Sequence, residues 1–340
     1  MLTTDYIRIE RHTKQFNMHF DATYLVTGST GFIGGEVVSF LKYLHDRGYG
    51  GIQLILPVRN IEKASRLFGN EDYISYVLWN MEDELNVSEE VDYVIHAAGP
   101  VGFSYQWDTP YLCMKQHING MFQLVEAIKN QKIHKCVFIG TGISYGRLLK
   151  ERTDAIEEGE VGLFPSMDTK TCYASGKLAA EYILACARKE YGIPVNVVRL
   201  FSGYGPRMNL MNGSVFSELY NALLSGKVLE IRGDGLPIRN FCYTTDLVVG
   251  ILYVLFLGSN GEAYNIGSET ENYSIRELAE IMAESVNPVR QILIENQLEQ
   301  SFVRSVQIPS VERIKKLGWH SLVTLKEGIS YMNEYYKVHQ

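Results

Sequence analysis

Residues 23–34 read TYLVTGSTGFIG, a short apolar run that ends in three evenly spaced glycines, Gly28, Gly31 and Gly34. An amphipathic pattern over residues 34–47 follows at once, so the segment predicts a strand, a tight turn and a helix. Glycines in such a turn let backbone N–H groups approach a pyrophosphate, which the N-terminus of the helix also attracts. The placement at the first strand favours a dinucleotide-binding turn over a plain glycine-rich connection.

The pattern that begins there repeats along the chain, because short β-branched runs alternate with longer runs whose apolar residues recur every three to four positions. Such alternation is typical of βαβ units around a parallel sheet. We therefore expect an α/β protein with a doubly wound parallel sheet of the Rossmann type. The predicted strands are residues 23–27, 52–58, 73–78, 91–97, 135–141, 194–201 and 262–266, and the main helices between them are residues 34–47, 111–129 and 173–191.

The regular alternation stops after Ser202, where a turn-rich segment leads into a helix and a short strand near residues 228–231. This irregularity predicts a smaller C-terminal α/β lobe that binds the substrate. We expect an N-terminal arm at residues 1–20, a dinucleotide-binding domain at 21–201 plus about 237–267, and a lobe at 202–236 plus 268–340. The arm packs either on the sheet or on a second subunit, and the sequence leaves both open.

Composition narrows the function classes. The 340 residues are 46% hydrophobic and 21% charged, with a net charge of -7, so the chain is globular and lacks the basic surface of a nucleic-acid or anionic-membrane binder. The five cysteines contain no CxxC pair and the eight histidines no HxxH pair, so we expect no metal site and no disulfide framework. No apolar run approaches the roughly 20 residues of a membrane span. We expect a cytoplasmic protein with a small-molecule partner.

Tyr173 and Lys177 are a candidate acid/base pair. They are four residues apart and so share one helix face, where an ammonium beside a phenol lowers the phenol pKa and favours proton transfer. Thr141, at the carboxyl end of a predicted strand, adds a hydroxyl at the sheet edge where ligands bind in open α/β folds. Tyr111 and Lys115 have the same spacing, but no strand-end hydroxyl precedes them, so we interpret them as structural.

Several motifs in order resemble the extended short-chain dehydrogenase/reductase family, and more narrowly its nucleotide-sugar epimerase, dehydratase and decarboxylase branch. The likeness covers about residues 21–335, and the segments within 199–246 look most like UDP-glucuronate decarboxylases. The motifs are TGSTGFIG (27–34), HAAG (96–99), Asn119 in QHINGMFQLVEA, Thr141 before Tyr145-Gly146, YASGK (173–177), RLFSGYGPR (199–207), GDG (233–235) and RNFCYTTD (239–246).

The resemblance implies roles for individual residues. Thr141, Tyr173 and Lys177 would be catalytic: Thr141 and Tyr173 would bind the sugar C4 oxygen, while Lys177 would bind the nicotinamide ribose and tune Tyr173. Asn119 would order the active-site region, or else serve as an ordinary buried helix amide. The residues expected to bind the cofactor are Gly28, Thr30, Gly31, Phe32, Ile33, Gly34, Arg59, Ala97, Ala98, Asn119, Tyr173 and Lys177.

Arginines are the expected substrate ligands besides Thr141. Arg239 and Arg304 match arginines that contact the nucleotide diphosphate in relatives, and Arg207 is a further candidate. Arg59 follows the second strand, where NAD-binding relatives usually carry an acidic residue. It favours NADP slightly over NAD, although an arginine there also stacks on adenine with either cofactor.

The expected activity is C4 hydride transfer on a nucleoside-diphosphate hexose, by a 4-epimerase or a 4-ketoreductase. Relatives that eliminate water carry an Asp-Glu pair after the strand-end threonine and decarboxylases a Glu at the second position, whereas this chain has Gly142 and Ile143. Neither side chain transfers a proton, so we expect no elimination unless Asp168 or another loop carboxylate supplies the base. The alternatives are a dehydratase or decarboxylase with acid/base groups from elsewhere, and a non-catalytic dinucleotide sensor.

Three further expectations concern structure. By resemblance we expect a homodimer formed through the helices at 111–129 and 173–191, whose apolar residues also suit ordinary packing on the sheet. Asp246 is predicted to cap the helix that follows it, since it directly precedes an apolar run. Cys172, beside Tyr173 but off its helical face, is interpreted as structural.

Overall fold

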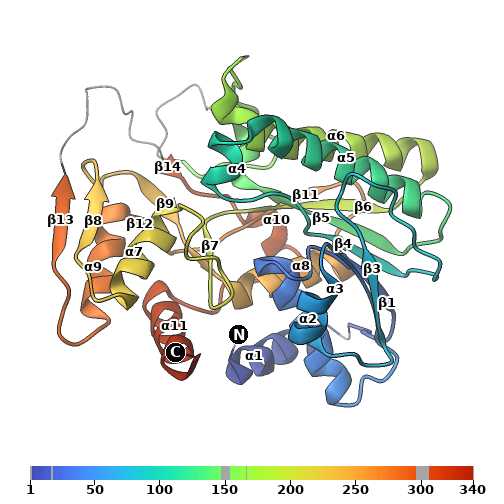
Figure 1. Cartoon of the computed structure of the whole chain (residues 1–340), viewed down its shortest axis with the longest axis horizontal. Coiled ribbons are helices and arrows are strands. Elements are labelled where there is room, and N and C mark those ends of the chain that lie inside the picture. The colour runs from blue at the N-terminus through green and yellow to red at the C-terminus, as the bar shows by residue number, and fades with distance from the viewer. Residues whose placement is uncertain (1, 17, 147–153, 166, 296–305, 340) are drawn as a thin grey trace.

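The computed structural model describes residues 2–16, 18–146, 154–165, 167–295 and 306–339, and its centre is a seven-stranded parallel sheet beside a smaller lobe (Figure 1). The sheet order is β11-β6-β5-β4-β1-β2-β3. From β1 the chain adds β2 and β3 on one side, and it then crosses to the other side of β1 to add β4, β5, β6 and β11. All seven predicted strands are present, which confirms the predicted α/β class. Their bounds are β1 Thr23–Thr27, β2 Gln53–Val58, β3 Ile74–Leu78, β4 Tyr93–His96, β5 Lys135–Thr141, β6 Val195–Leu200 and β11 Ala263–Ile266.

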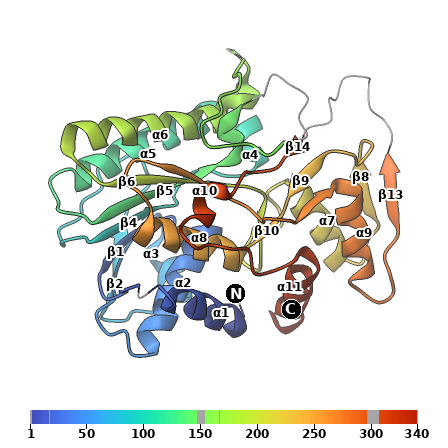
Figure 2. The ribbon, with the colours of Figure 1, turned by 180° about the vertical axis from the view of Figure 1, so that it is seen from behind.

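Helices cover both faces of this sheet (Figures 1 and 2). On one face lie α5 (Pro110–Ile128) and α6 (Cys172–Tyr191); on the other lie α2 (Phe32–Asp46), α3 (Ile61–Phe68), α8 (Thr244–Leu257) and α10 (Glu312–Lys315). Side chains of β1 alternate between the two cores, because Leu25 packs under α5 and α6 while Tyr24 and Val26 pack against α2 and α8. Burial on both faces explains why the strands read as nearly continuous apolar runs.

The N-terminal arm folds as a helix, α1 (Thr3–Lys14), which packs against α8 and α2. Ile9 is fully buried in the core on that side of the sheet. Asp5 is also fully buried, and its carboxylate accepts hydrogen bonds from the hydroxyls of Tyr243 and Thr245, each at 3.2 Å. Of the two sites left open by the sequence, the arm thus occupies the helical layer over the sheet of its own subunit.

The lobe has a core of its own, rich in tyrosine and phenylalanine. It contains α7 (Val215–Leu224), α9 (Ile275–Glu284), α11 (Leu325–His339) and the pair β8 (Leu229–Arg232) and β13 (Ile292–Glu295). Short strands connect it to the large sheet region: β7 (Gly203–Tyr204) with β10 (Cys242–Tyr243), and β9 (Ile238–Asn240) with β12 (Asn272–Ser274) and β14 (Val306–Gln307). The domain boundaries stay a prediction.

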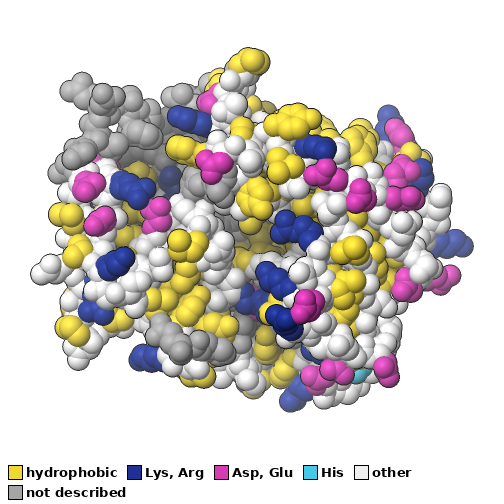
Figure 3. Space-filling view, viewed as in Figure 1, with side chains coloured by type: hydrophobic (Ala, Val, Ile, Leu, Met, Phe, Trp, Pro, Cys, Tyr) yellow, Lys and Arg dark blue, Asp and Glu magenta, His cyan; other side chains and the backbone are white. Residues whose placement is uncertain are grey.

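Three short helical segments lie near the carboxyl ends of the strands: α4 (Phe103–Trp107), η1 (Gly142–Tyr145) and η2 (Thr169–Thr171). In the space-filling view, Lys and Arg side chains gather beside a hollow between the sheet and the lobe (Figure 3). Within the described ranges, no helix is both long and apolar enough to cross a membrane.

Candidate active site

The glycine turn after β1 is closed by backbone contacts that exclude side chains. Gly28 has φ +68°, and a Cβ there would lie 2.6 Å from the backbone of Ala97 and Ala98; a Cβ on Gly34 would lie 2.5 Å from the Gly28 carbonyl oxygen. Gly31 N–H donates to that same carbonyl at 2.9 Å. The turn opens directly into α2, whose N-cap Gly31 provides no side-chain hydrogen bond to the first N–H groups. Within the part of the chain that the structure describes, these N–H groups have no acceptor from the N-cap side chain, and they form a cradle that fits a pyrophosphate.

Two strand ends are fixed next to this turn. The Thr27 hydroxyl and His96 Nδ1 are 2.7 Å apart, and the backbone N–H of Ala98 donates to the same hydroxyl at 3.1 Å. Burial, and secondarily the charge of Lys177, lower the pKa of His96 to about 3, so the imidazole is neutral. The pair holds β1 and β4 in register and places Ala97 and Ala98 beside Gly28.

Thr141, Tyr173 and Lys177 lie together, as the sequence predicts. Thr141 ends β5 and is 8% exposed, and its side chain hydrogen-bonds the Tyr173 phenol, which projects from the first turn of α6. Lys177, one turn further along α6, is 3% exposed and donates from Nζ to the Ile139 carbonyl oxygen at 2.8 Å. Its ammonium also lies 4.7 Å from the centre of the Phe138 ring. A hydroxyl, a phenol and an ammonium thus meet at the carboxyl edge of the sheet.

The electrostatics of this group differ from the sequence prediction in one respect. Burial raises the pKa of Tyr173 to about 12, and only the hydrogen bond with Thr141 opposes the rise. The predicted lowering of the Tyr173 pKa by Lys177 is wrong, because the ammonium is directed to the Ile139 carbonyl. Burial lowers the pKa of Lys177 itself to about 8, while Glu181 acts to raise it. At neutral pH the site therefore holds a protonated phenol and an ammonium that deprotonates in mild alkali.

The structure brings His117, and not Asn119, against Tyr173. The His117 ring is 3% exposed and contacts the Tyr173 ring edge-on at 5.4 Å between ring centres. Asn119 is half-buried. Because it follows His117 by two residues in α5, its side chain points to a different side of the helix. Sequence reasoning missed His117, although one signal was present: Cys113, His117 and Gly120 share the buried face of α5.

The candidate arginines are spread over three places. Arg59 is exposed just after β2. Arg207 lies against the glycine-turn helix, 3.5 Å from the Ser39 hydroxyl and with its guanidinium 5.6 Å from the centre of the Phe68 ring. Arg239 is half-buried on β9, where burial lowers the pKa of its guanidinium and one nitrogen donates to the Ile238 carbonyl at 2.9 Å. Arg304 lies outside the described residues.

Three structural interpretations can be checked directly. Tyr111 is 81% exposed and Lys115 forms an ion pair with Glu82 at 2.6 Å, so that pair is structural, as predicted. Cys172 is buried, and its thiol donates to the Gln106 carbonyl at 3.6 Å. Asp246 is not the N-cap that the sequence predicts, because α8 begins two residues earlier.

Instead, the Asp246 carboxylate ties the C-terminal segment to α8. One oxygen accepts the backbone N–H groups of Leu322 and Val323 at 3.0 and 3.2 Å, and the other has no hydrogen-bond partner among the described residues. Burial raises the pKa of Asp246 to about 7. The carboxyl group thus has a structural role at the base of the lobe.

A comparison with family models decides where the chain belongs. Residues 24–267 match the NAD dependent epimerase/dehydratase family. The chain belongs to this family. It is accordingly an enzyme, and the resemblance read from its motifs is confirmed.

Individual relatives of this family member carry out different reactions. It is 28% identical over 324 residues to UDP-glucuronic acid decarboxylase 5 of Arabidopsis thaliana, covering 92% of this chain and 89% of the relative. It is 27% identical over 335 residues to dTDP-D-glucose 4,6-dehydratase of Homo sapiens, covering 94% and 91%. UDP-glucuronic acid 4-epimerase from Bacillus cereus, solved with UDP-glucuronic acid and NAD, has a TM-score of 0.76 at 23% identity over 94% of this chain and 100% of that one, and so shares the fold.

Gly142 and Ile143 stand at the positions where the resemblance implies acidic residues in enzymes that catalyse an elimination. A Cβ on Gly142 would lie 2.7 Å from the ring of Phe201, which is 5% exposed, so the aromatic ring fills the space of a side chain. Ile143 is 49% exposed. Asp168 is exposed and caps η2, where its carboxylate accepts the Lys170 N–H at 3.0 Å. Neither position carries a proton-transferring group, and Asp168 is engaged at a helix start.

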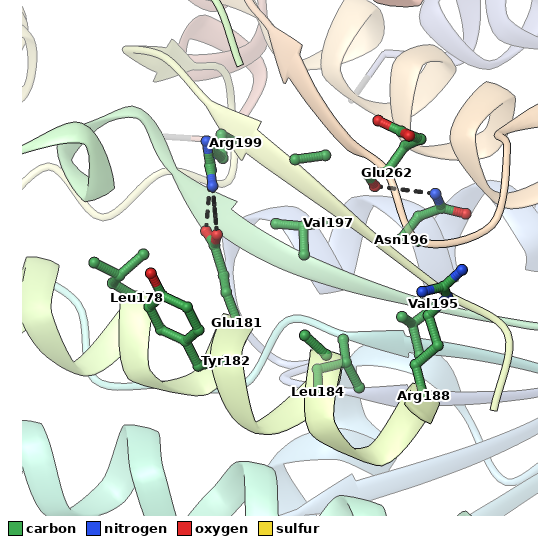
Figure 4. Close-up of a pocket in the computed structure, with 13 residues that line it drawn as sticks. Leu178, Glu181, Tyr182, Leu184, Arg188, Val195, Asn196, Val197, Arg199 and Glu262 are labelled. Carbon is green, nitrogen blue, oxygen red and sulfur yellow. Dashed lines mark hydrogen bonds and ion pairs between the residues drawn. The ribbon is translucent and has the colours of Figure 1, made fainter. Parts of the chain in front are cut away.

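A cavity of about 240 Å³ lies elsewhere, between α6, the edge strand β11 and its neighbour β6 (Figure 4). At one end Glu181 and Arg199 form an ion pair of 2.7 Å. Thr141, Tyr173 and Lys177 do not line this cavity, so it is separate from the candidate active site. Among the described residues there is also no cluster of three or more His, Cys, Asp or Glu side chains suited to a metal ion.

Proposed function

We propose that this enzyme binds a nicotinamide dinucleotide and a nucleoside-diphosphate hexose, and transfers hydride at C4 of the sugar as a 4-epimerase or a 4-ketoreductase. The observation that carries the proposal is the meeting of Thr141, Tyr173 and Lys177 at the sheet edge, next to a glycine cradle and without an elimination base at positions 142 and 143. The relatives named as nucleotide-sugar enzymes support the substrate class.

The residues present fit a dinucleotide. The cradle at Gly28, Gly31 and Gly34 suits its pyrophosphate, and Lys177 suits a ribose hydroxyl as a charged donor. When bound, the dinucleotide would supply hydride exchange at C4. Arg59, exposed after β2, favours NADP slightly over NAD, while the Bacillus cereus structure was solved with NAD. Both forms belong in the binding test.

The chain's own groups handle the proton. Tyr173 is protonated at neutral pH, so its phenol is the acid that gives a proton to a C4 carbonyl oxygen when a ketone is reduced. In the reverse direction the base is the Tyr173 phenolate left after that donation: it takes up the proton of the C4 hydroxyl, and the Thr141 hydroxyl stabilises it by donating a hydrogen bond. Arg239, and Arg304 by resemblance, are proposed to hold the diphosphate, with Arg207 as a further candidate.

Turnover of a panel of nucleotide sugars tests this function. Purified protein is expected to bind NAD or NADP and to change some UDP-, dTDP-, GDP- or CDP-sugar at C4, as seen by NMR of the product. Binding of the dinucleotide with no turnover across the panel would replace the proposal with the dinucleotide sensor, against which the intact Thr141, Tyr173 and Lys177 argue.

A dehydratase or a decarboxylase is the second candidate, because the relatives with these names cover nearly all of the chain. Turnover in deuterated water distinguishes it. We expect product changed only at C4 and without deuterium at C5, since general-base help worth about 10²- to 10⁴-fold is missing at Gly142 and Ile143. Deuterium at C5, loss of the C6 hydroxyl or release of carbon dioxide would contradict this expectation.

The proposed compartment is a reducing cytoplasm. All five cysteines are free thiols, including Cys113 and Cys172 near the candidate site. A chain whose thiols stay reduced suits that environment.

A further inference from the structure

His117 has a nitrogen atom that the described structure leaves without a partner. Its Nε2 is buried and makes no hydrogen bond within the described residues. Burial, followed by the charge of Lys177, lowers the pKa of His117 to about 2, so the ring is neutral and carries one N–H donor and one lone pair. An unpaired polar atom in the interior costs free energy, so a partner for this atom is expected.

The hydrogen-bond pattern identifies which nitrogen carries the lone pair. The ring bonds to the backbone of Pro100, and because proline has no N–H, the imidazole must donate to the Pro100 carbonyl. Nε2 has no partner, so the donor is Nδ1. The lone pair is consequently on Nε2, at the tip of the ring, where a donor is needed.

The groups around this lone pair leave few possible donors. A Cβ on Gly99 would lie 2.5 Å from His117 Cε1 and 3.6 Å from Lys177 Nζ, so the imidazole and the ammonium flank the same glycine. On the other side of the ring, a Cβ on Gly176 would lie 3.3 Å from His117 Cδ2. Since Nε2 is closed off from solvent, its donor has to come from the protein, and the Lys177 ammonium has N–H groups beyond the one used on Ile139.

We propose that His117 is a positioning residue for Lys177: its Nε2 accepts a hydrogen bond from the Lys177 ammonium, which then holds Ile139 and His117 with two of its donors and presents the third to the ligand. The role in ligand binding rests on the proposed function; the contact between the two side chains does not. In the described structure Lys177 Nζ is bonded to the Ile139 carbonyl and His117 Nε2 has no partner.

The charge balance at Lys177 makes this contact measurable. The titratable groups around it are His96 on β4, Cys113 and His117 on α5, and Tyr173 and Glu181 on α6. Burial already lowers the pKa of Lys177, and Glu181 raises it. An acceptor on His117 favours the charged form, so its removal is expected to lower the Lys177 pKa further.

The first experiment follows Lys177 in the ligand-free protein, by NMR titration of its side-chain carbon next to the amine. His117→Phe keeps a planar ring without the acceptor, and His117→Gln keeps an acceptor near the position of Nε2. We expect the Lys177 midpoint to fall by at least about half a pH unit in His117→Phe and to stay near the wild-type value in His117→Gln. Equal midpoints in wild type and His117→Phe would overturn the proposal.

The second experiment measures NAD and NADP affinity by calorimetry between pH 6 and pH 9. The His117→Phe variant is expected to bind the dinucleotide about tenfold more weakly than wild type at pH 8.5, and less than threefold more weakly at pH 6. The tenfold loss is the size expected for one hydrogen bond to a charged group. Met121→Leu, on the same buried face of α5, is the control for packing. A His117→Phe loss that is the same at every pH would mean a packing role only and would overturn the proposal.

The two experiments separate this inference from the proposed function. If the wild-type protein binds neither dinucleotide, the proposed function fails while the NMR titration still decides the role of His117. If His117→Gln lowers the Lys177 midpoint as much as His117→Phe does, the hydrogen-bond acceptor does not set the Lys177 pKa. The inference about His117 then fails, while the proposed function is unaffected.

Discussion

Tyr173 is the residue on which the proposed chemistry depends most. Tyr173→Phe removes the phenol and keeps the ring that packs against His117, so kcat is expected to fall by about 10²- to 10⁴-fold while dinucleotide affinity stays within about threefold. Steady-state kinetics and calorimetry measure the two effects. Tyr111→Phe, at the exposed tyrosine of the other YxxxK pair, is the matched control and should keep full activity. A loss under tenfold in Tyr173→Phe would exclude Tyr173 as the acid/base.

Asp246 makes a second prediction at the scale of one residue, concerning stability against pH. Its folded pKa of about 7 is above the ordinary value of 3.8, so the folded protein holds the proton more tightly and this contribution to stability is lost as pH rises from about 4 to 7. Asp246→Asn carries no such dependence. The free energy of unfolding of the variant relative to wild type should therefore rise by up to about 4 kcal/mol over that range.

Chemical denaturation at pH 4, 5, 6 and 7 tests the Asp246 prediction. Asp72→Asn, at an exposed carboxylate, is the control and should show a constant difference from wild type. A constant difference for Asp246→Asn as well would mean that Asp246 is already ionised in the folded protein at low pH.

Helix α1 is one of the elements that the structure adds to the sequence prediction. Ile9 is fully buried between α1 and the sheet-covering helices, whereas Ile7 on the same helix is 43% exposed. Ile9→Ala is expected to lower the free energy of unfolding by about 2–5 kcal/mol, and Ile7→Ala by less than about 0.5 kcal/mol. Urea unfolding of both variants gives the comparison. If both variants changed the free energy of unfolding by the same small amount, the packing of α1 would not contribute to stability.

The same helix shows why an element can escape detection by pattern. Its buried residues are Asp5, Ile9, Glu10 and Thr13, of which only one is apolar, so no hydrophobic stripe marks the helix. The carboxylates can be buried because hydroxyl groups from distant parts of the chain donate hydrogen bonds to them. Tyr243 and Thr245 donate to Asp5, and Tyr43 donates to Glu10. Strands β1, β2, β4 and β5 have no such dependence, because they are buried on both faces and their sequences are nearly continuous apolar runs.

Some features of the candidate site could be predicted from the sequence, and others could not. Thr141, Tyr173 and Lys177 were predictable, because a strand end and a four-residue helical spacing determine where they meet. The raised pKa of Tyr173 and the position of His117 were not predictable, because both depend on how α5 packs against α6 and on where the Lys177 ammonium finds an acceptor. The spacing of residues in the sequence predicts where these side chains lie, whereas their pKa values depend on how deeply the fold buries them.

For the whole molecule, the homodimer through α5 and α6 stays a prediction, and the structure shows which apolar residues of these helices are exposed. Met121, Val125, Leu184 and Ala187 are buried within the subunit, so they pack on the sheet. The outer apolar face consists of Tyr111, Met114, Phe122 and Tyr182, which are 36–81% exposed. Light scattering is expected to give twice the 38.6 kDa chain mass, and Phe122→Asp to give a monomer.

Leu67→Asp is the control for the dimer experiment. Leu67 is a 44% exposed apolar residue on α3, which lies on the opposite side of the sheet, so this variant should keep the dimer mass. A wild-type mass near 38.6 kDa at micromolar concentration would refute the prediction.

The contact between Gly142 and Phe201 bears on which neighbouring activities evolution can reach from this chain. A decarboxylase-like Glu at position 143 needs one replacement, of an isoleucine that already faces outward. A dehydratase-like Asp at position 142 meets the Phe201 ring at once, because even its Cβ would lie 2.7 Å from that ring. The aspartate becomes acceptable only after Phe201 has been exchanged for a smaller residue, at the cost of a cavity in the meantime. The order of substitutions is therefore constrained: starting from the proposed C4 chemistry, the replacement at position 143 is accessible, whereas the one at position 142 is blocked at its first step.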